Sequence, residues 1–150
     1  MPVDRLEAFR KIIEEVIPFN RLLGLQLVTA EDGKATARFD FRDELVGNPI
    51  TRVLHGGVIA AVLDVIGASA VMSTFTEEAP LYGMGTVDLR VDFLRPGSGA
   101  HFVATGTVMR PGRILAAARS ELHNDRSELI AMGTAIYRVS RKPQQAPPNV

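Results

Sequence analysis

The sequence predicts an α+β domain in which an antiparallel sheet is wrapped around one long central helix. Residues 56–75 form an almost uninterrupted run of small and aliphatic residues, which is typical of a buried helix. Four segments after this run have the pattern of strands joined by short turns, and short turns require antiparallel pairing. A helix that is apolar on nearly every side has to be enclosed by the sheet beside it.

Composition limits the classes of function that are open to the chain. The 150 residues carry 17 Lys and Arg against 17 Asp and Glu, and this balance argues against a general nucleic-acid-binding protein. The sequence has no cysteine, which excludes disulfides, thiolate metal sites and cysteine nucleophiles. Residues 1–16 mix acidic and basic side chains and lack the apolar core of a signal peptide, so we expect a cytoplasmic protein.

The first part of the chain is expected to form an amphipathic helix and then a hairpin. Over residues 4–17 the apolar side chains recur with helical spacing, at Leu6, Phe9, Ile12, Ile13 and Val16. Residues 24–42 predict two strands joined by a turn with Asp-Gly at its centre. Residues 43–54 contain Gly, Asn and Pro in succession, so we expect a loop there.

The second half of the chain is expected to form the other four strands. In the first of them apolar residues alternate with polar ones. The apolar set is Val87, Leu89, Val91 and Phe93, and the polar set is Thr86, Asp88, Arg90 and Asp92. Three more strands are predicted near 101–110, 113–123 and 128–140. Residues 1–140 therefore form one domain, and the polar, Pro-rich tail 141–150 is expected to be disordered.

The long helix is also the one segment that could be considered as a membrane span. Its length is close to that of a transmembrane helix. Asp64 near its middle would be costly in lipid, and no second apolar span or flanking basic belt accompanies it. We therefore expect a buried helix and no membrane association.

The start of this helix, His55-Gly56-Gly57, has a backbone that could bind an anion. The first N–H groups of a helix have no partner within it and lie at the positive end of its dipole. Glycine lets another molecule approach that backbone closely, so an oxyanion could be bound there. The two glycines could equally serve only to make a tight junction between loop and helix.

Asp64 is the only charge inside the long apolar helix. A buried carboxylate is costly unless it is paired or hydrogen-bonded. It could be a satisfied core residue, or it could be a base in an active site. Gly56 and Asp64 are separated by about 12 Å along the helix, which is too far for both to act on one carbonyl. Two antiparallel copies of the helix would solve this, so we expect a site shared across a twofold dimer.

Four stretches of sequence carry a resemblance to a known family: GNPITRVLHGGVIAAVLD, the small-residue helix that follows it, TVDLRVDFLRP, and MGTAIYRV. Together they resemble hotdog-fold acyl-CoA thioesterases of the PaaI-like (phenylacetate-pathway) group, over about residues 20–140. The resemblance implies a sheet wrapped around the helix, and dimers that pair into tetramers. It implies that the Gly56 amide polarises the thioester carbonyl while Asp64 of the partner chain acts as nucleophile or general base. It implies no cofactor.

The resemblance extends to several other positions. It implies that Asn48 lies near the site and that the Thr86 hydroxyl orients water or the carboxylate. His55 could be a proton shuttle or a local hydrogen-bonding residue that shapes the loop. Further candidates contact the substrate: Gly57 at the helix start, and Arg110 and Arg113 at the phosphates of coenzyme A. The sequence has no metal-binding motif and no nucleophile-elbow serine.

Two other functions remain open from the sequence. A hydratase or dehydratase acting on enoyl or hydroxyacyl thioesters would need a histidine and a carboxylate placed together, and no such pair is evident. A binding module for acyl-CoA or an aromatic ligand would use Asp64 only as an interface residue. The acyl group is also open, with medium- to long-chain aliphatic and aromatic groups both possible.

Overall fold

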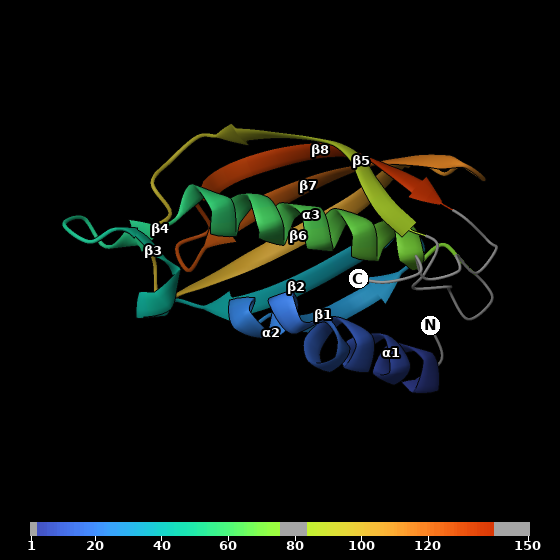
Figure 1. Ribbon diagram of the computed structural model, residues 1–150, viewed down its shortest axis with the longest axis horizontal. Helices are drawn as coiled ribbons and strands as arrows, with labels where there is room; N and C mark the ends of the chain where they lie inside the picture. Colours follow the sequence, from blue (N-terminus) through green and yellow to red (C-terminus); the bar gives the residue numbers. More distant parts are fainter. Residues whose placement is uncertain (1–2, 76–83, 140–150) are drawn as a thin grey trace, which may run out of the picture.

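A six-stranded antiparallel sheet forms the body of the protein in the computed structural model, which describes residues 3–75 and 84–139. The strands lie in the order β1-β2-β6-β7-β8-β5 (Figure 1). Their bounds are β1 Gln26–Glu31, β2 Lys34–Asp40, β5 Met84–Phe93, β6 His101–Arg110, β7 Leu115–Asn124 and β8 Leu129–Val139. The predicted hairpin and the four later strands are thereby confirmed. The predicted tail lies outside the described residues.

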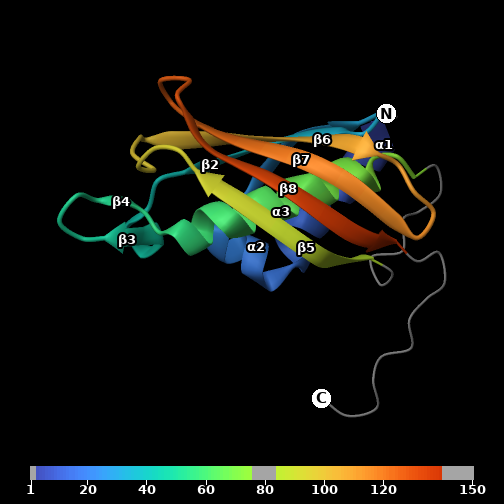
Figure 2. The same cartoon turned by 90° about the horizontal axis from the view of Figure 1, so that it is seen from above.

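The long helix α3, Gly56–Met72, lies in the concave face of this sheet (Figures 1 and 2). It contacts all six strands, which confirms the predicted hotdog arrangement of a sheet wrapped around one helix. Among the helices that the structure describes, none is long and apolar enough to cross a membrane.

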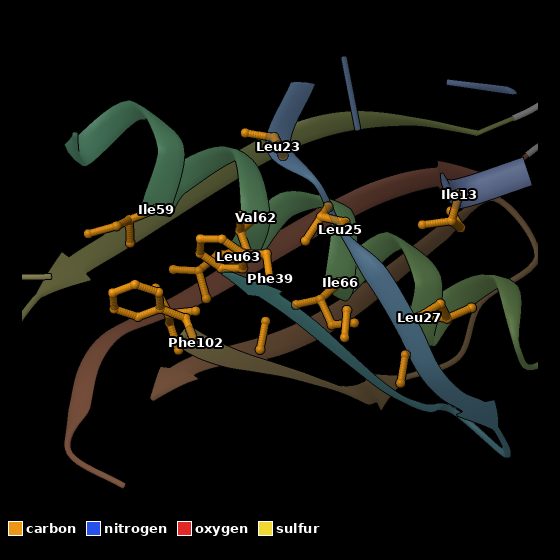
Figure 3. Packing of buried hydrophobic residues seen from close by; sticks show 14 of the residues in the cluster. Ile13, Leu23, Leu25, Leu27, Phe39, Ile59, Val62, Leu63, Ile66 and Phe102 are labelled. Atoms are coloured by element: carbon orange, nitrogen blue, oxygen red, sulfur yellow. The ribbon is translucent and has the colours of Figure 1, made fainter. Parts of the chain in front are cut away.

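The core forms where α3 meets the sheet (Figure 3). Val62, Leu63 and Ile66 of α3 are fully buried, and they pack against Phe39 of β2 and Phe102 of β6. The two phenylalanine rings stack with their centroids 5.2 Å apart. Complete burial of each such side chain contributes about 1.5–3 kcal/mol, so this contact fixes the inward face of α3.

The N-terminal segment differs from the single helix predicted over residues 4–17. It forms α1, Val3–Arg10, a π-helical turn η1, Lys11–Val16, and a short helix α2, Pro18–Leu23. In η1 a hydrogen bond joins residues five apart in the sequence, one more than in an α-helix, as between Ile17 N–H and Ile12 O at 3.2 Å. The wider turn rotates the residues after Ile12, and Val16 is 55% exposed instead of facing inward.

Residues 43–54, predicted to be a loop, contain a short 3₁₀ helix η2, Asp43–Leu45, and a small two-stranded ribbon. The ribbon is formed by β3, Val46–Asn48, and β4, Val53–Leu54. Asn48 makes its turn possible, because the side-chain oxygen accepts from the amides of Ile50 at 2.9 Å and Thr51 at 3.3 Å. The ribbon projects beyond the end of the sheet at which α3 begins (Figure 1).

The two edges of the sheet are treated differently. Along β1 the edge is capped by the N-terminal segment, where Arg10 Nε donates to Leu27 O at 2.8 Å and Leu27 N–H donates to Glu14 Oε1 at 2.7 Å. Within the described ranges, β5 pairs with β8 on one side and has no neighbour on the other. An uncovered edge of ten residues presents free backbone donors and acceptors.

Candidate active site

His55 sets the start of α3. It is the N-cap residue, and its Nδ1 accepts a hydrogen bond from the Gly57 amide at 2.8 Å. A Cβ at Gly57 would lie 2.9 Å from that nitrogen, so the close approach of the imidazole requires glycine here. Because Nδ1 accepts, the proton of a neutral ring is on Nε2. The Gly57 amide is thus engaged within its own chain.

The Gly56 amide is the group left available at the helix start. After the Gly57 amide, the amides of Val58 and Ile59 donate to the His55 carbonyl at 3.0 and 3.2 Å. Within the described part of the chain, the Gly56 N–H has no acceptor. The Phe93 ring lies beside it, with Cε1 3.5 Å from where a Cβ would stand on Gly56. This corner therefore presents one unpaired donor against an exposed aromatic ring.

Asp64 lies in the middle of α3, beside strands β5 and β8 of the sheet. In a single chain the residue is half-buried, and the further burial that we expect would come from a second chain. Thr86 Oγ1 on β5 donates to Asp64 Oδ1 at 2.8 Å. Oδ2 has no hydrogen-bond partner among the residues that the structure describes. One carboxylate oxygen is held while the other is free to act on a substrate or water.

A β-bulge in β5 brings Thr86 to this carboxylate. Thr86 pairs with Tyr137 of β8, whereas Val87 and Asp88 both lie opposite Ile136. Residues directly opposite each other point to the same face, so Thr86 shares the α3-facing side with Tyr137. The alternation of apolar and polar residues predicted that Val87 faces α3 and that Thr86 faces outward. Val87 is in fact 60% exposed.

Tyr137 is the site residue that the sequence reasoning did not identify. Its side chain is fully buried, and its hydroxyl donates to the Asp64 main-chain carbonyl at 2.8 Å. Burial raises the pKa of Tyr137, and the nearby charge of Asp64 raises this pKa further. A tyrosine among the inward-facing apolar residues of a strand was a usable signal, because a buried phenol needs a hydrogen-bond partner.

Within one chain these residues form two separate groups. Gly56, His55 and the ribbon that carries Asn48 lie at the first turn of α3. Asp64 lies eight residues further along the helix, about 12 Å along its axis, and Thr86 of β5 is bonded to it there. Asn48 uses its side-chain oxygen in its own turn, which leaves only the amide nitrogen for other partners. A single chain therefore does not bring the donor and the carboxylate to one carbonyl.

The two candidate arginines lie away from the helix start. Arg110 ends β6 and Arg113 follows it, both exposed. At that end of the sheet, Val108 donates to Gly33 O, and a Cβ on Gly33 would be 3.4 Å from Thr74, just past the C-terminus of α3. Both arginines thus lie toward the opposite end of α3 from Gly56 in the same chain.

Apolar side chains with some exposure lie on the elements that carry the two groups. Val58, Ala61 and Val65 of α3 are half-buried, and Phe93 at the end of β5 and Leu94 after it are exposed. In the described residues no three His, Asp or Glu side chains are placed to bind a metal ion. The available chemistry is therefore a carboxylate, a hydroxyl and a backbone donor beside an apolar surface, which suits addition to a carbonyl.

Comparison with known proteins gives consistent matches across most of the chain. The sequence profile described as "Thioesterase superfamily" matches residues 52–131. The medium/long-chain acyl-CoA thioesterase YigI of Salmonella typhimurium is 46% identical over 133 residues, covering 82% of this chain and 86% of YigI. The YigI protein of Escherichia coli K12 is 45% identical over the same shares of the two chains.

Solved structures agree with the sequence matches. A Shewanella oneidensis protein related to the thioesterase superfamily has a TM-score of 0.80 and 37% identity, covering 91% of this chain and 96% of its own. A thioesterase family protein from Silicibacter pomeroyi has a TM-score of 0.74 and 26% identity, covering 87% and 96%. The similarity thus includes the sheet and the helix that carry the two groups of residues.

Proposed function

This chain belongs to the thioesterase superfamily and is a thioester hydrolase, and we propose that it cleaves medium- and long-chain acyl-CoA thioesters to the free acid and coenzyme A. The YigI relatives, which bear that substrate class in their name, support it, and so does the apolar surface of Val58, Ala61, Val65 and Phe93. The reaction proposed here uses no cofactor, because a carboxylate and water supply the chemistry.

The observation that carries the mechanism is that only one of the two carboxylate oxygens of Asp64 is hydrogen-bonded within the described residues. Thr86 fixes Oδ1, and Oδ2 can either attack the thioester carbonyl or remove a proton from an attacking water. In both routes the carbonyl oxygen becomes negative and accepts from the Gly56 amide. Collapse of the intermediate breaks the C–S bond and releases the coenzyme A thiolate. In the water route the thiolate takes up the proton that Asp64 removed, and the free acid is formed directly. In the direct route the thiolate takes a proton from water, and a water molecule then hydrolyses the anhydride between the acyl group and Asp64, which releases the free acid and restores the carboxylate.

The site is proposed to be completed by a second copy of the chain. The uncovered β5 edge supports this, because two such edges can pair antiparallel about a twofold axis. That pairing sets two α3 helices side by side in opposite directions. The Gly56 amide of one protomer then faces Asp64 of its partner, which removes the separation of about 12 Å within one chain. Association of such dimers into tetramers is part of the same proposal.

The remaining candidate residues take secondary roles in this proposal. His55 caps α3 and keeps the Gly56 amide outermost, in preference to moving a proton. Asn48 has a free side-chain amide that can donate to the substrate at the end of the molecule where α3 begins. Arg110 and Arg113 would contact the coenzyme A phosphates from the partner chain, since they lie toward the other end of α3 in their own.

The test is thiol release from short-, medium-, long-chain and aromatic acyl-CoAs, with wild type and Asp64→Asn compared side by side. A thiol reagent is suitable because the protein has no cysteine. We expect turnover highest on medium and long chains, and lower by several orders of magnitude in Asp64→Asn with the fold retained. Absence of turnover on every thioester, with tight acyl-CoA binding, would instead indicate a binding module. Hydration of an enoyl-CoA without thiol release would indicate a hydratase.

A further inference from the structure

Tyr137 joins the sheet to the backbone of α3 at the reactive carboxylate. Its hydroxyl donates to the Asp64 carbonyl at 2.8 Å, from a ring that is fully buried. A main-chain carbonyl has two lone pairs, so it can accept this bond in addition to the helical one. The Ala68 amide, one turn along α3, also acts on the hydroxyl and lowers the pKa of Tyr137, against burial, the charge of Asp64 and the interaction with its side chain, which all raise it.

The surrounding residues make room for this contact. A Cβ on Gly67 would lie 2.4 Å from the Tyr137 hydroxyl oxygen, so any larger residue would push the phenol away from the helix. On the sheet, Tyr137 is paired directly with Thr86, and the β5 bulge lies immediately after that pair. Two neighbouring hydroxyls therefore reach the same residue, with Tyr137 on the Asp64 backbone and Thr86 on its carboxylate.

This double attachment acts at the reactive residue itself, whereas the hydrogen bond from the Gly33 amide to Ser73 Oγ holds α3 at its C-terminal end and the apolar side chains between pack against the sheet. Side-chain atoms lie about 5–6 Å from the axis of a helix, so a rotation of roughly 10° moves a carboxylate by about 1 Å. A displacement of that size at a reacting group can lower a rate by as much as about a hundredfold. The rotation of α3 at Asp64 is therefore a sensitive coordinate for the reaction.

We propose that Tyr137 is a positioning residue, whose hydroxyl fixes the rotation of α3 so that Asp64 stays bonded to Thr86 and directs its free oxygen at the thioester. This rests on the proposed function, because the reacting group is Asp64. Gly67 is needed for the same contact, since the absence of a side chain there lets the phenol reach the helix backbone. Neither residue touches the substrate.

Three variants separate positioning from stability. Tyr137→Phe removes only the hydroxyl. Gly67→Ala adds a methyl group 2.4 Å from the hydroxyl, so it should lower both the melting temperature and the turnover. In the double variant, which combines Tyr137→Phe with Gly67→Ala, the added methyl group occupies the space left by the hydroxyl, so the packing should recover. Each protein is measured for thermal unfolding and for kcat and KM on the acyl-CoA that wild type hydrolyses fastest.

We expect Tyr137→Phe to lower kcat about five- to tenfold while KM stays within about twofold, because the bond acts on Asp64 and not on substrate binding. The double variant should regain the melting temperature of Tyr137→Phe without regaining wild-type kcat. Thr86→Val added to Tyr137→Phe should cost less than the product of the two single effects, since both hydroxyls hold one residue.

Wild-type kcat in Tyr137→Phe, or its return in the double variant, would overturn the proposal. Crystal structures of wild type and Tyr137→Phe provide a readout that does not depend on turnover. We expect the variant to lose the contact of 2.8 Å between Thr86 and Asp64, and an unchanged contact would also count against the role of Tyr137. Failure of wild type to release thiol would refute the proposed function, and these structures would still decide the positioning claim.

Discussion

Replacement of Gly56 by proline should remove the proposed oxyanion donor and leave the fold intact. Gly56 is the first residue of α3, the one helical position at which proline is favoured, because the N–H there has no partner in the helix. His55 before it has φ −63° and ψ 135°, the extended conformation that a residue preceding proline prefers. A Cβ at position 56 meets only the Phe93 ring, at an ordinary 3.5 Å.

The expected loss follows from the loss of a single donor. Removal of one preorganised donor to an oxyanion costs about 3–4 kcal/mol of transition-state stabilisation, so kcat should fall by about 100- to 1,000-fold. The melting temperature should be unchanged or slightly higher, since proline restricts the unfolded chain. Thiol release and thermal unfolding measure the two quantities on the same samples.

Gly56→Ala is the matched control. It adds a Cβ in the same place as proline does but keeps the N–H, so it should retain kcat within about tenfold of wild type. If folded Gly56→Pro turns over as fast as Gly56→Ala, the Gly56 amide does not stabilise the oxyanion. The assignment of the helix start as part of the site would then be wrong.

Three further predictions concern the shared site, the helix cap and acid stability. Inactive Gly56→Pro and Asp64→Asn chains, refolded together, should recover about a quarter of wild-type activity, because half of the dimers are mixed and each of these has one intact site; a site within one chain would recover nothing. His55→Ala should lower the free energy of unfolding by about 1 kcal/mol, whereas His55→Asn, which can still cap α3, should keep both stability and kcat; a large loss of kcat in folded His55→Asn would instead make His55 a proton shuttle. The hydrogen bond from Asn124, with help from Arg126, lowers the pKa of Glu128 below 4.5. Its contribution to stability is therefore present above that pH and lost as the pH falls through the lowered pKa. Glu128→Gln should melt below wild type at about pH 7, and this difference should shrink toward about pH 3; a constant difference would contradict the ionic origin.

Much of the fold followed from local patterns in the sequence. The run 56–75 predicted a buried helix, which the structure has over Gly56–Met72, and the alternation and turns after it predicted antiparallel strands, because burial of apolar side chains sets both periods. The N-terminal segment was harder to predict. Pro18 signals a break, because the residue before proline disfavours the helical conformation, but the π-helical turn over Lys11–Val16 comes with a bond from the Asn20 side chain to Ile13 O at 3.0 Å. That bond is a tertiary contact with no periodic signature.

The site divides in the same way. The sequence determined which groups are present: a lone carboxylate at 64 inside an apolar helix, and a glycine at 56 whose amide begins that helix. Their separation along one helix follows from helical rise alone, so even the expectation of a second chain came from the sequence.

Only the tertiary structure decided how Asp64 is held. Strand alternation puts Thr86 on the outer face, and an unpaired Val87 in the bulge turns it inward, which depends on register with β8 and not on any local preference. Tyr137 reaches the Asp64 backbone across 73 positions in sequence because Gly67 leaves space for its hydroxyl. Residue types are encoded locally and can be read from the chain, whereas the register and close approach that bring these hydroxyls to one carboxylate arise only when the sheet closes around the helix.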